Sequence, residues 1–94
     1  MLEFDWDNNK AKSNLEKHGV SFDEAKSVFK DFSAYIFDDE KHSSIEKREL
    51  IIGYSKMNRI LIVCFTMRDN KIRIINTRLT NKLERTIYEE NKIK

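Results

Sequence analysis

The sequence predicts a small α+β domain in which helices pack on one face of an antiparallel sheet of about four strands. Three observations lead to this fold class. Two segments near the N-terminus and one near the C-terminus space their apolar residues as helices do. Three consecutive segments between them are rich in Ile, Val, Leu, Phe and Tyr, as strands are. The connections between these strand segments are short, which favours antiparallel pairing of neighbours.

The size of the chain limits the number of domains. Its 94 residues, of which 39% are hydrophobic, suffice for one core but not for two. Proline is absent and only two glycines occur, so no Pro- or Gly-rich linker divides the chain. We therefore expect one domain over residues 1–94.

The N-terminal segment is expected to form a short strand over Leu2–Trp6, followed by a helix. Asn8 and Asn9 are suitable caps for this helix, because their side chains accept bonds from unpaired backbone N–H groups. Gly19 supplies the left-handed residue that ends the helix. The apolar stripe of this helix is expected at Ala11, Leu15 and His18.

A second helix is expected to start at Ser21. The residues Ser21–Glu24 read S-F-D-E, a capping box in which each end side chain satisfies the backbone donor of the other. Val20 before the cap and Ala25 after it fit a hydrophobic staple. The apolar stripe of this helix is expected at Phe22, Ala25, Val28, Phe29 and Phe32.

The period of the apolar residues then changes to that of strands. The segments expected to form strands are Ala34–Phe37, Arg48–Tyr54, Arg59–Met67 and Lys71–Thr77. The polar segment Asp38–Lys47 is expected to be a loop. Ser55–Asn58 allows one hairpin, and Asp69 and Asn70 allow another because both tolerate the positive φ of a tight turn. Ile60–Phe65 is apolar on both faces, which predicts a central strand covered on both sides.

The last element is expected to be a helix over Asn81–Glu90. Asn81 and Glu84 have capping-box spacing, and Glu84 and Tyr88 lie four residues apart on a shared face. The apolar stripe of this helix is expected at Leu79, Leu83 and Ile87.

The net charge of +2 conceals an uneven distribution. Residues 1–50 carry 8 Lys and Arg against 12 Asp and Glu, whereas residues 51–94 carry 10 against 4. All the arginines lie late in the chain, at Arg48, Arg59, Arg68, Arg73, Arg78 and Arg85. Such asymmetry is typical of a surface that binds a polyanion. The alternative is that these arginines are solvated or pair with nearby carboxylates.

Composition also excludes several classes of protein and site. No apolar run is long enough to span a membrane, and the acidic N-terminal segment does not resemble a signal peptide. The lone Cys64 cannot form an internal disulfide, which fits a cytoplasmic protein. The two histidines and Cys64 are far apart in sequence and match no metal motif, so we expect neither a metal nor a cofactor.

Strand alternation predicts where the arginines project. In the last strand, Asn76 and Arg78 are expected on the side of Ile72 and Ile74. The arginines would then stand at strand ends around an apolar middle, where guanidinium groups hold phosphates with two parallel bonds.

The residues around Arg78 also suggest a chemistry. Glu84 and Tyr88 follow Arg78 on the final helix, so a carboxylate, a phenol and a guanidinium are expected to meet. A metal-free ribonuclease needs a base for the ribose 2′-hydroxyl, cations for the phosphorane and a proton donor for the leaving group. Glu84 or His18 would be the base, Arg68 and Arg78 the phosphate clamp, and Tyr88 the group that positions or donates a proton. The alternative is that Glu84 and Tyr88 only cap the helix and the core.

Several segments resemble the BrnT family, the toxin half of a bacterial type II toxin–antitoxin system. They are FDWDNNKAKSNLEKHGVSFDEA, HSSIEKRELIIGYS and RILIVCFTMRDNKIRIINTRLTNKLERTIYEE, which together cover nearly the whole chain. The resemblance implies a RelE-like fold, a ribonuclease that inhibits translation, and a BrnA-type antitoxin that holds it inactive in a hetero-oligomer. It also implies that this complex represses its own operon.

The resemblance carries roles to individual residues. The arginine and tyrosine used in RelE-like enzymes match Arg78 and Tyr88, and the arginine that opens the central strand matches Arg59. The further BrnT-like motif residues are His18, Arg48, Arg68, Arg73 and Glu84. The catalytic group is therefore expected to be Arg68, Arg78, Glu84, Tyr88 and His18. The residues expected to bind RNA are Arg48, Arg59, Arg73 and Lys71.

The sequence thus predicts a metal-independent endoribonuclease toxin that cleaves RNA by attack of the 2′-hydroxyl. A non-catalytic RNA-binding module would use the same arginines without needing Glu84, Tyr88 or His18. A protein-interaction subunit would use its charges only to select a partner.

Overall fold

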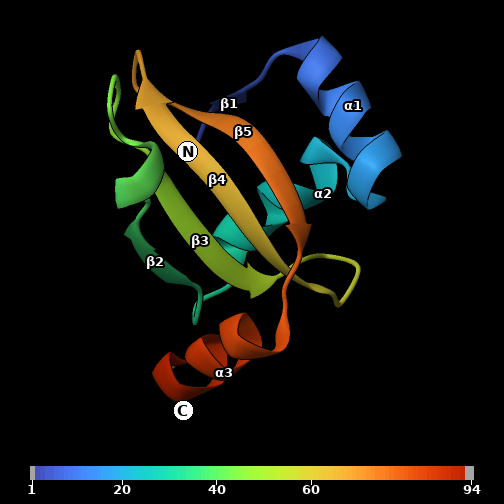
Figure 1. The fold of residues 1–94 in the computed structure, drawn as a ribbon. Helices are drawn as coiled ribbons and strands as arrows, with labels where there is room; N and C mark the ends of the chain where they lie inside the picture. The colour runs from blue at the N-terminus through green and yellow to red at the C-terminus, as the bar shows by residue number, and fades with distance from the viewer. Residues whose placement is uncertain (1, 93–94) are drawn as a thin grey trace.

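The computed structural model describes residues 2–92, which form one five-stranded sheet with helices on both of its faces (Figure 1). Within these residues the strands are β1 (Phe4–Asp5), β2 (Tyr35–Asp38), β3 (Glu49–Tyr54), β4 (Ile60–Arg68) and β5 (Lys71–Leu79). The helices are α1 (Asn8–His18), α2 (Phe22–Ser27) and α3 (Lys82–Asn91), with 3₁₀ turns η1 (Val28–Lys30) and η2 (Glu40–His42). No helix in this range is long and apolar enough to cross a membrane.

The α+β class is confirmed, but the expected sheet of about four antiparallel strands is wrong. The strand order is β1-β5-β4-β3-β2, and β1 pairs with β5 in parallel, so the sheet is mixed. The other pairs are antiparallel, as expected for β3, β4 and β5 from the short connections between them. The parallel pairing of β1 with β5 needs a long connection, which is provided by the chain between them, including α1 and α2.

The expected placement of all helices on one face is also wrong. The larger core lies between the sheet and α1, α2 and η1, and includes Phe22, Val28 and Leu61. A smaller core on the opposite face joins Tyr88 of α3 to Ile52 and Ile62. The sequence prediction that β4 is covered on both sides is confirmed, because Leu61 and Ile62 are buried against different cores.

Helix α1 is capped by a residue other than those expected, and its apolar stripe is only partly as predicted. Its N-cap is Asp7, whose carboxylate accepts from the backbone of Asn9 and Lys10, rather than Asn8 or Asn9. Gly19 ends the helix in the left-handed conformation, as predicted. Ala11 of the expected stripe packs against the larger core, but Leu15 and His18 are exposed, and the buried residue of the helix is Asn14.

Helix α2 begins at the predicted cap and ends early. Ser21 accepts from the Glu24 backbone at 3.0 Å, but the Glu24 side chain turns away to Arg59 and Ser55, so the reciprocal half of the capping box is missing. The helix tightens into η1 after Ser27. Phe32 therefore lies beyond the helix and is 94% exposed, outside the stripe in which we expected it.

A bulge in β5 changes the face on which Arg78 projects. Cys64 pairs with Asn76 and Phe65 with Ile74, so Ile75 is one extra residue in the ladder. Ile72, Ile74 and Thr77 consequently face α1 and α2, while Asn76 and Arg78 face the opposite side with Ile62 and Cys64. The alternation predicted from the sequence is therefore wrong beyond Ile74.

The turns at the ends of β4 and the cap of α3 are as predicted from the sequence. Asn58, Asp69 and Asn70 have positive φ in the two hairpin connections. Asn81 and Glu84 form the complete capping box of α3. The expected apolar stripe of α3 is wrong, because Leu79 and Leu83 are exposed and Tyr88 is the buried residue of this helix.

Candidate active site

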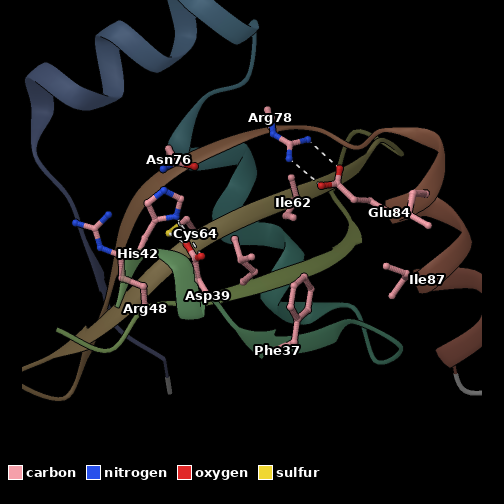
Figure 2. A pocket seen from close by; sticks show the side chains of 12 residues that line it. Phe37, Asp39, His42, Arg48, Ile62, Cys64, Asn76, Arg78, Glu84 and Ile87 are labelled. Atoms are coloured by element: carbon pink, nitrogen blue, oxygen red, sulfur yellow. Dashed lines mark hydrogen bonds and ion pairs between the residues drawn. The ribbon is translucent and has the colours of Figure 1, made fainter. Parts of the chain in front are cut away.

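The face of the sheet opposite α1 and α2 carries a hollow of about 440 Å³ bounded by α3 and η2. One end is polar and is lined by Asp39, His42, Arg48 and Asn76; Arg78 and Glu84 line the side nearer α3 (Figure 2). The floor and the remaining wall are apolar or contain a thiol, and consist of Phe37, Leu50, Ile62, Cys64, Leu83 and Ile87. Because β5 is bulged, its polar residues join the wall of this hollow.

Arg78 and Glu84 form a two-bonded ion pair at the edge of the hollow. The two terminal nitrogens of Arg78 donate to the two carboxylate oxygens of Glu84, each at 2.8 Å. Burial alone would raise the pKa of the Glu84 carboxyl, but the bonds from Arg78 and from the Asn81 backbone outweigh it, so this pKa lies below its ordinary value. Glu84 is therefore ionised and fully engaged, and it fixes the plane of the Arg78 guanidinium.

Asp39 and His42 form a carboxylate–imidazole pair at the other end. The Nδ1 atom of His42 lies 3.1 Å from both carboxylate oxygens of Asp39. The Asp39 side chain is nearly buried, whereas the His42 side chain is more than half exposed and lines the hollow. Such a carboxylate selects the tautomer and orientation of the ring and leaves Nε2 for a ligand or substrate.

The loop that bears His42 is fixed by one hydroxyl. Ser43 donates from Oγ to the Asp39 carbonyl at 2.6 Å and accepts from the Arg48 backbone at 3.0 Å. The backbone of Asp39 in turn donates to the Arg48 carbonyl. The segment that we expected to be a plain loop is thus a closed turn that holds Asp39, His42 and Arg48 in one place.

Cys64 lies beneath Asp39 in the floor of the hollow. Its Sγ atom is 3.8 Å from a carboxylate oxygen of Asp39. Burial, and then the charge of Asp39, raise the pKa of this thiol to about 11. The thiol is therefore protonated at neutral pH and acts as a weak donor to Asp39, not as a nucleophile.

Arg48 and Arg68 extend the basic character of this end. Both pair with Glu46, Arg48 at 3.8 Å and Arg68 at 3.0 Å. A second hollow, of about 380 Å³, is lined by Arg48, Arg68 and His42 among others, so it adjoins the first. Arg68 therefore lies beside the candidate site, with Arg48 and His42 between the two hollows.

Tyr88 does not line the hollow, although the sequence grouped it with Arg78 and Glu84. Its side chain is 3% exposed and its hydroxyl donates to Asp31 at 2.8 Å. The same Asp31 oxygen accepts from the Tyr54 backbone, and it reaches that position because Gly53 has no Cβ to obstruct it. Burial, and then the bond to Asp31, raise the pKa of the Tyr88 phenol above its ordinary value.

The remaining residues predicted for the site are dispersed over the molecule. His18 lines a separate hollow on α1, and Arg59 binds Glu24 and the Gly19 carbonyl on the α2 side. Arg73 pairs with Asp5 of β1, and Lys71 is exposed at the β4–β5 turn. The structure therefore groups Arg48, Arg78 and Glu84, with Arg68 adjacent, and separates the others from them.

Sequence reasoning missed Asp39 and His42. The signal was present as a D-x-x-H spacing in a polar segment with no helical or strand period, where functional side chains are common. Within residues 2–92, no three His, Cys, Asp or Glu side chains are placed together as metal ligands.

Comparison with known proteins shows the family to which the chain belongs. A family model described as the ribonuclease toxin BrnT of type II toxin–antitoxin systems matches residues 6–84. No curated protein matches the chain. The 1.1 Å crystal structure of the Brucella abortus ribonuclease toxin BrnT is 26% identical, with a TM-score of 0.68 over 87% of this chain and 100% of that one. The chain thus belongs to the BrnT family of ribonuclease toxins of type II toxin–antitoxin systems.

Proposed function

We propose that this protein is a metal-independent endoribonuclease in which His42 moves the proton and Arg48 and Arg78 hold the scissile phosphate. The 2′-hydroxyl of the substrate attacks the adjacent phosphorus, and the products are a cyclic phosphate and a 5′-hydroxyl. The observation that carries the proposal is one hollow that contains an oriented imidazole between two guanidinium groups.

Each step has a group of suitable chemistry. Neutral His42 accepts the proton of the 2′-hydroxyl at Nε2, while Asp39 stabilises the imidazolium that forms. The imidazolium then returns a proton to the 5′-oxygen as that group leaves. Arg48 and Arg78 stabilise the extra negative charge on the phosphorane.

Three other residues predicted for catalysis, Arg68, Glu84 and Tyr88, receive supporting roles, whereas His18 lies in a separate hollow and receives none. Glu84 is a poor base because its pKa is lowered and both of its oxygens accept from Arg78, so it serves to orient Arg78. Arg68 binds a neighbouring phosphate from the adjoining hollow. Tyr88 positions α3, because its side chain is buried and its hydroxyl donates to Asp31.

The partner is expected to be a BrnA-type antitoxin that forms a hetero-oligomer with this chain in the cytoplasm. An acidic or amphipathic segment of the antitoxin suits the candidate site and the exposed Leu79 and Leu83 beside it. Covering this region would block access of RNA and thereby relieve inhibition of translation.

The proposal is tested with an RNA oligonucleotide containing one cleavable linkage. Because removal of a general acid or base slows catalysis by about 10²- to 10⁴-fold, His42→Ala and Asp39→Asn are expected to lose cleavage on that scale. A 2′-O-methyl group at the cleavage site should abolish the reaction, and EDTA should leave it unchanged. Expression of the wild-type chain should arrest growth, and Arg78→Ala should relieve the arrest.

A variant of His18 tests whether His42 or His18 moves the proton. His18→Ala should retain cleavage of a dinucleotide, because His18 lies outside the hollow that contains Arg78. Loss of activity in folded His18→Ala with retention in His42→Ala would reverse the assignment. RNA binding without cleavage by the wild-type protein would instead identify a non-catalytic RNA-binding module.

A further inference from the structure

The arginines of the sheet and of its adjoining loops lie within ion-pair distance of a carboxylate, whereas the basic residues on one face of α1 do not. Five arginines each have a carboxylate oxygen within 4.0 Å: Arg48, Arg59, Arg68, Arg73 and Arg78. Lys10, Lys17 and His18 make no ion pair or side-chain hydrogen bond with any residue in the described range 2–92. Lys10 helps to lower the pKa of Asp7, but it lies beyond ion-pair distance.

These α1 residues line a hollow that adjoins the candidate active site. The hollow has a volume of about 300 Å³ and no acidic residue among those that line it. Asn76 of β5 lines both this hollow and the candidate site, so the two meet across β5. The Asn76 side chain bonds to none of the described residues, which leaves its amide available to a ligand that crosses between them.

The spacing of the lysines fits an extended polyanion. Lys10 and Lys17 are seven residues apart, which places them on the same face of α1, about 10 Å apart along the helix axis. Lys12 belongs to the same helix but does not line the hollow. Two ammonium groups at this separation suit two phosphates of one strand better than a single phosphate.

We propose that Lys10 and Lys17 form a second RNA-binding subsite, in which they bind phosphates of the strand that leaves the candidate site over Asn76. This inference rests on the proposed function, because the strand is identified as the RNA whose scissile phosphate lies near Arg78. The subsite increases affinity for long RNA without contributing to the bond cleavage.

The test measures binding of a twelve-nucleotide, fully 2′-O-methylated RNA as a function of salt concentration. Each phosphate contact with a single strand contributes about 0.7 to the slope of log affinity against log salt. The double variant Lys10→Ala/Lys17→Ala should therefore lower the slope by about 1.4. The matched control Lys12→Ala should keep the wild-type slope, since Lys12 lies outside the hollow.

Cleavage of a dinucleotide separates this inference from the proposed function. The double variant should cleave the dinucleotide at the wild-type rate, because that substrate is too short to reach α1 from the active site. An unchanged salt slope in the double variant, or an equal decrease in Lys12→Ala, would overturn the inference. Loss of antitoxin binding with normal RNA binding would also overturn it, and would identify this face as a protein interface. If the salt slopes of the wild type and the double variant differ as predicted but the wild type cleaves no RNA, the enzymatic function is refuted and the subsite is supported.

Discussion

The side-chain amide of Asn14 takes the place of a missing strand beside β5. Among residues 2–92, β1 pairs with Ile72 and Arg73 alone, so the outer edge of β5 has no strand partner there at Thr77. Asn14 accepts from the Thr77 backbone at 3.0 Å and donates to its carbonyl at 2.9 Å. It also donates to the carbonyl of Val20. One polar side chain thus anchors α1 to the strand that carries Asn76 and Arg78.

Replacement of Asn14 by Leu is expected to lower the free energy of unfolding by about 3 kcal/mol. The variant leaves buried backbone groups of Thr77 and Val20 without partners, and each such group costs about 1–3 kcal/mol. Urea denaturation measures the difference. Asn9→Ala, at an exposed position of the same helix, should change stability by less than about 0.5 kcal/mol. Equal stabilities for the two variants would show that the amide contributes nothing.

At the scale of elements, α3 is attached to the sheet by few contacts. Leu83 is 68% exposed, so the apolar contribution comes mainly from Tyr88 and the partly buried Ile87. The Tyr88 ring packs edge-on against Tyr54, and its hydroxyl bonds to Asp31. The position of Glu84, and through it the orientation of Arg78, depends on this attachment.

Tyr88→Phe should lower the free energy of unfolding by about 1–2 kcal/mol, because it removes one hydrogen bond to a charged group and keeps the ring. Amide hydrogen exchange should accelerate first in α3, and cleavage should fall less than in Arg78→Ala. Complete loss of cleavage with unchanged exchange in α3 would give the phenol a direct part in the chemistry.

Across the whole molecule, the partly or fully buried carboxylates of Glu24, Asp31 and Glu84 each join separate elements of the fold. Glu24 links α2 to Arg59 and Ser55, Asp31 links η1 to β3 and α3, and Glu84 links α3 to Arg78. The bonds that each carboxylate accepts hold its pKa below the ordinary value, which is 3.8 for Asp and 4.5 for Glu. In Asp31 and Glu84 these bonds outweigh a burial effect of opposite sign.

The pH dependence of stability follows from these directions. A carboxyl whose pKa is lower in the folded than in the unfolded state stabilises the protein at pH values above its unfolded-state pKa. This stabilisation is lost as the pH falls through the folded-state pKa. The urea midpoint should therefore be nearly constant from about pH 7 to 5 and should decrease below about pH 4. Glu24→Gln should weaken this decrease, whereas Glu16→Gln, at an exposed position, should not. A midpoint that rises on acidification would contradict the assignment.

The predictability of the fold differed between local and long-range features. Ser21, Gly19, Asn81 and the Asp69-Asn70 turn were predicted correctly, because caps and tight turns depend on neighbouring residues. The pairing of β1 with β5 depends on contacts between residues some 68 positions apart, as in Phe4 with Ile72, and leaves no local pattern. Asn14 was missed because a buried amide breaks the apolar stripe that identifies a packed helix face.

The candidate site was predictable only in part. Arg78 and Glu84 were expected together because the short turn between β5 and α3 brings them close. Tyr88 and Glu84 are four residues apart, but the helix turns the former into the core and the latter toward the hollow. The role of the loop containing His42 depends on the bonds of Ser43 across the turn, which residue spacing does not reveal.

The extra residue at Ile75 reconciles the sequence of β5 with the face on which Arg78 projects. With every residue kept but no bulge, unbroken alternation from Ile74 would turn Arg78 toward the α1 and α2 side and move Thr77 out of the core. Deletion of Ile75 would instead remove the bulge and leave Thr77 and Arg78 on the faces that they now occupy. Substitution of Ile75 leaves that geometry intact. In an evolving lineage, relatives with or without the extra residue should therefore keep an arginine on the face of the hollow, whereas a shift of one further residue in this segment would mark loss of toxicity.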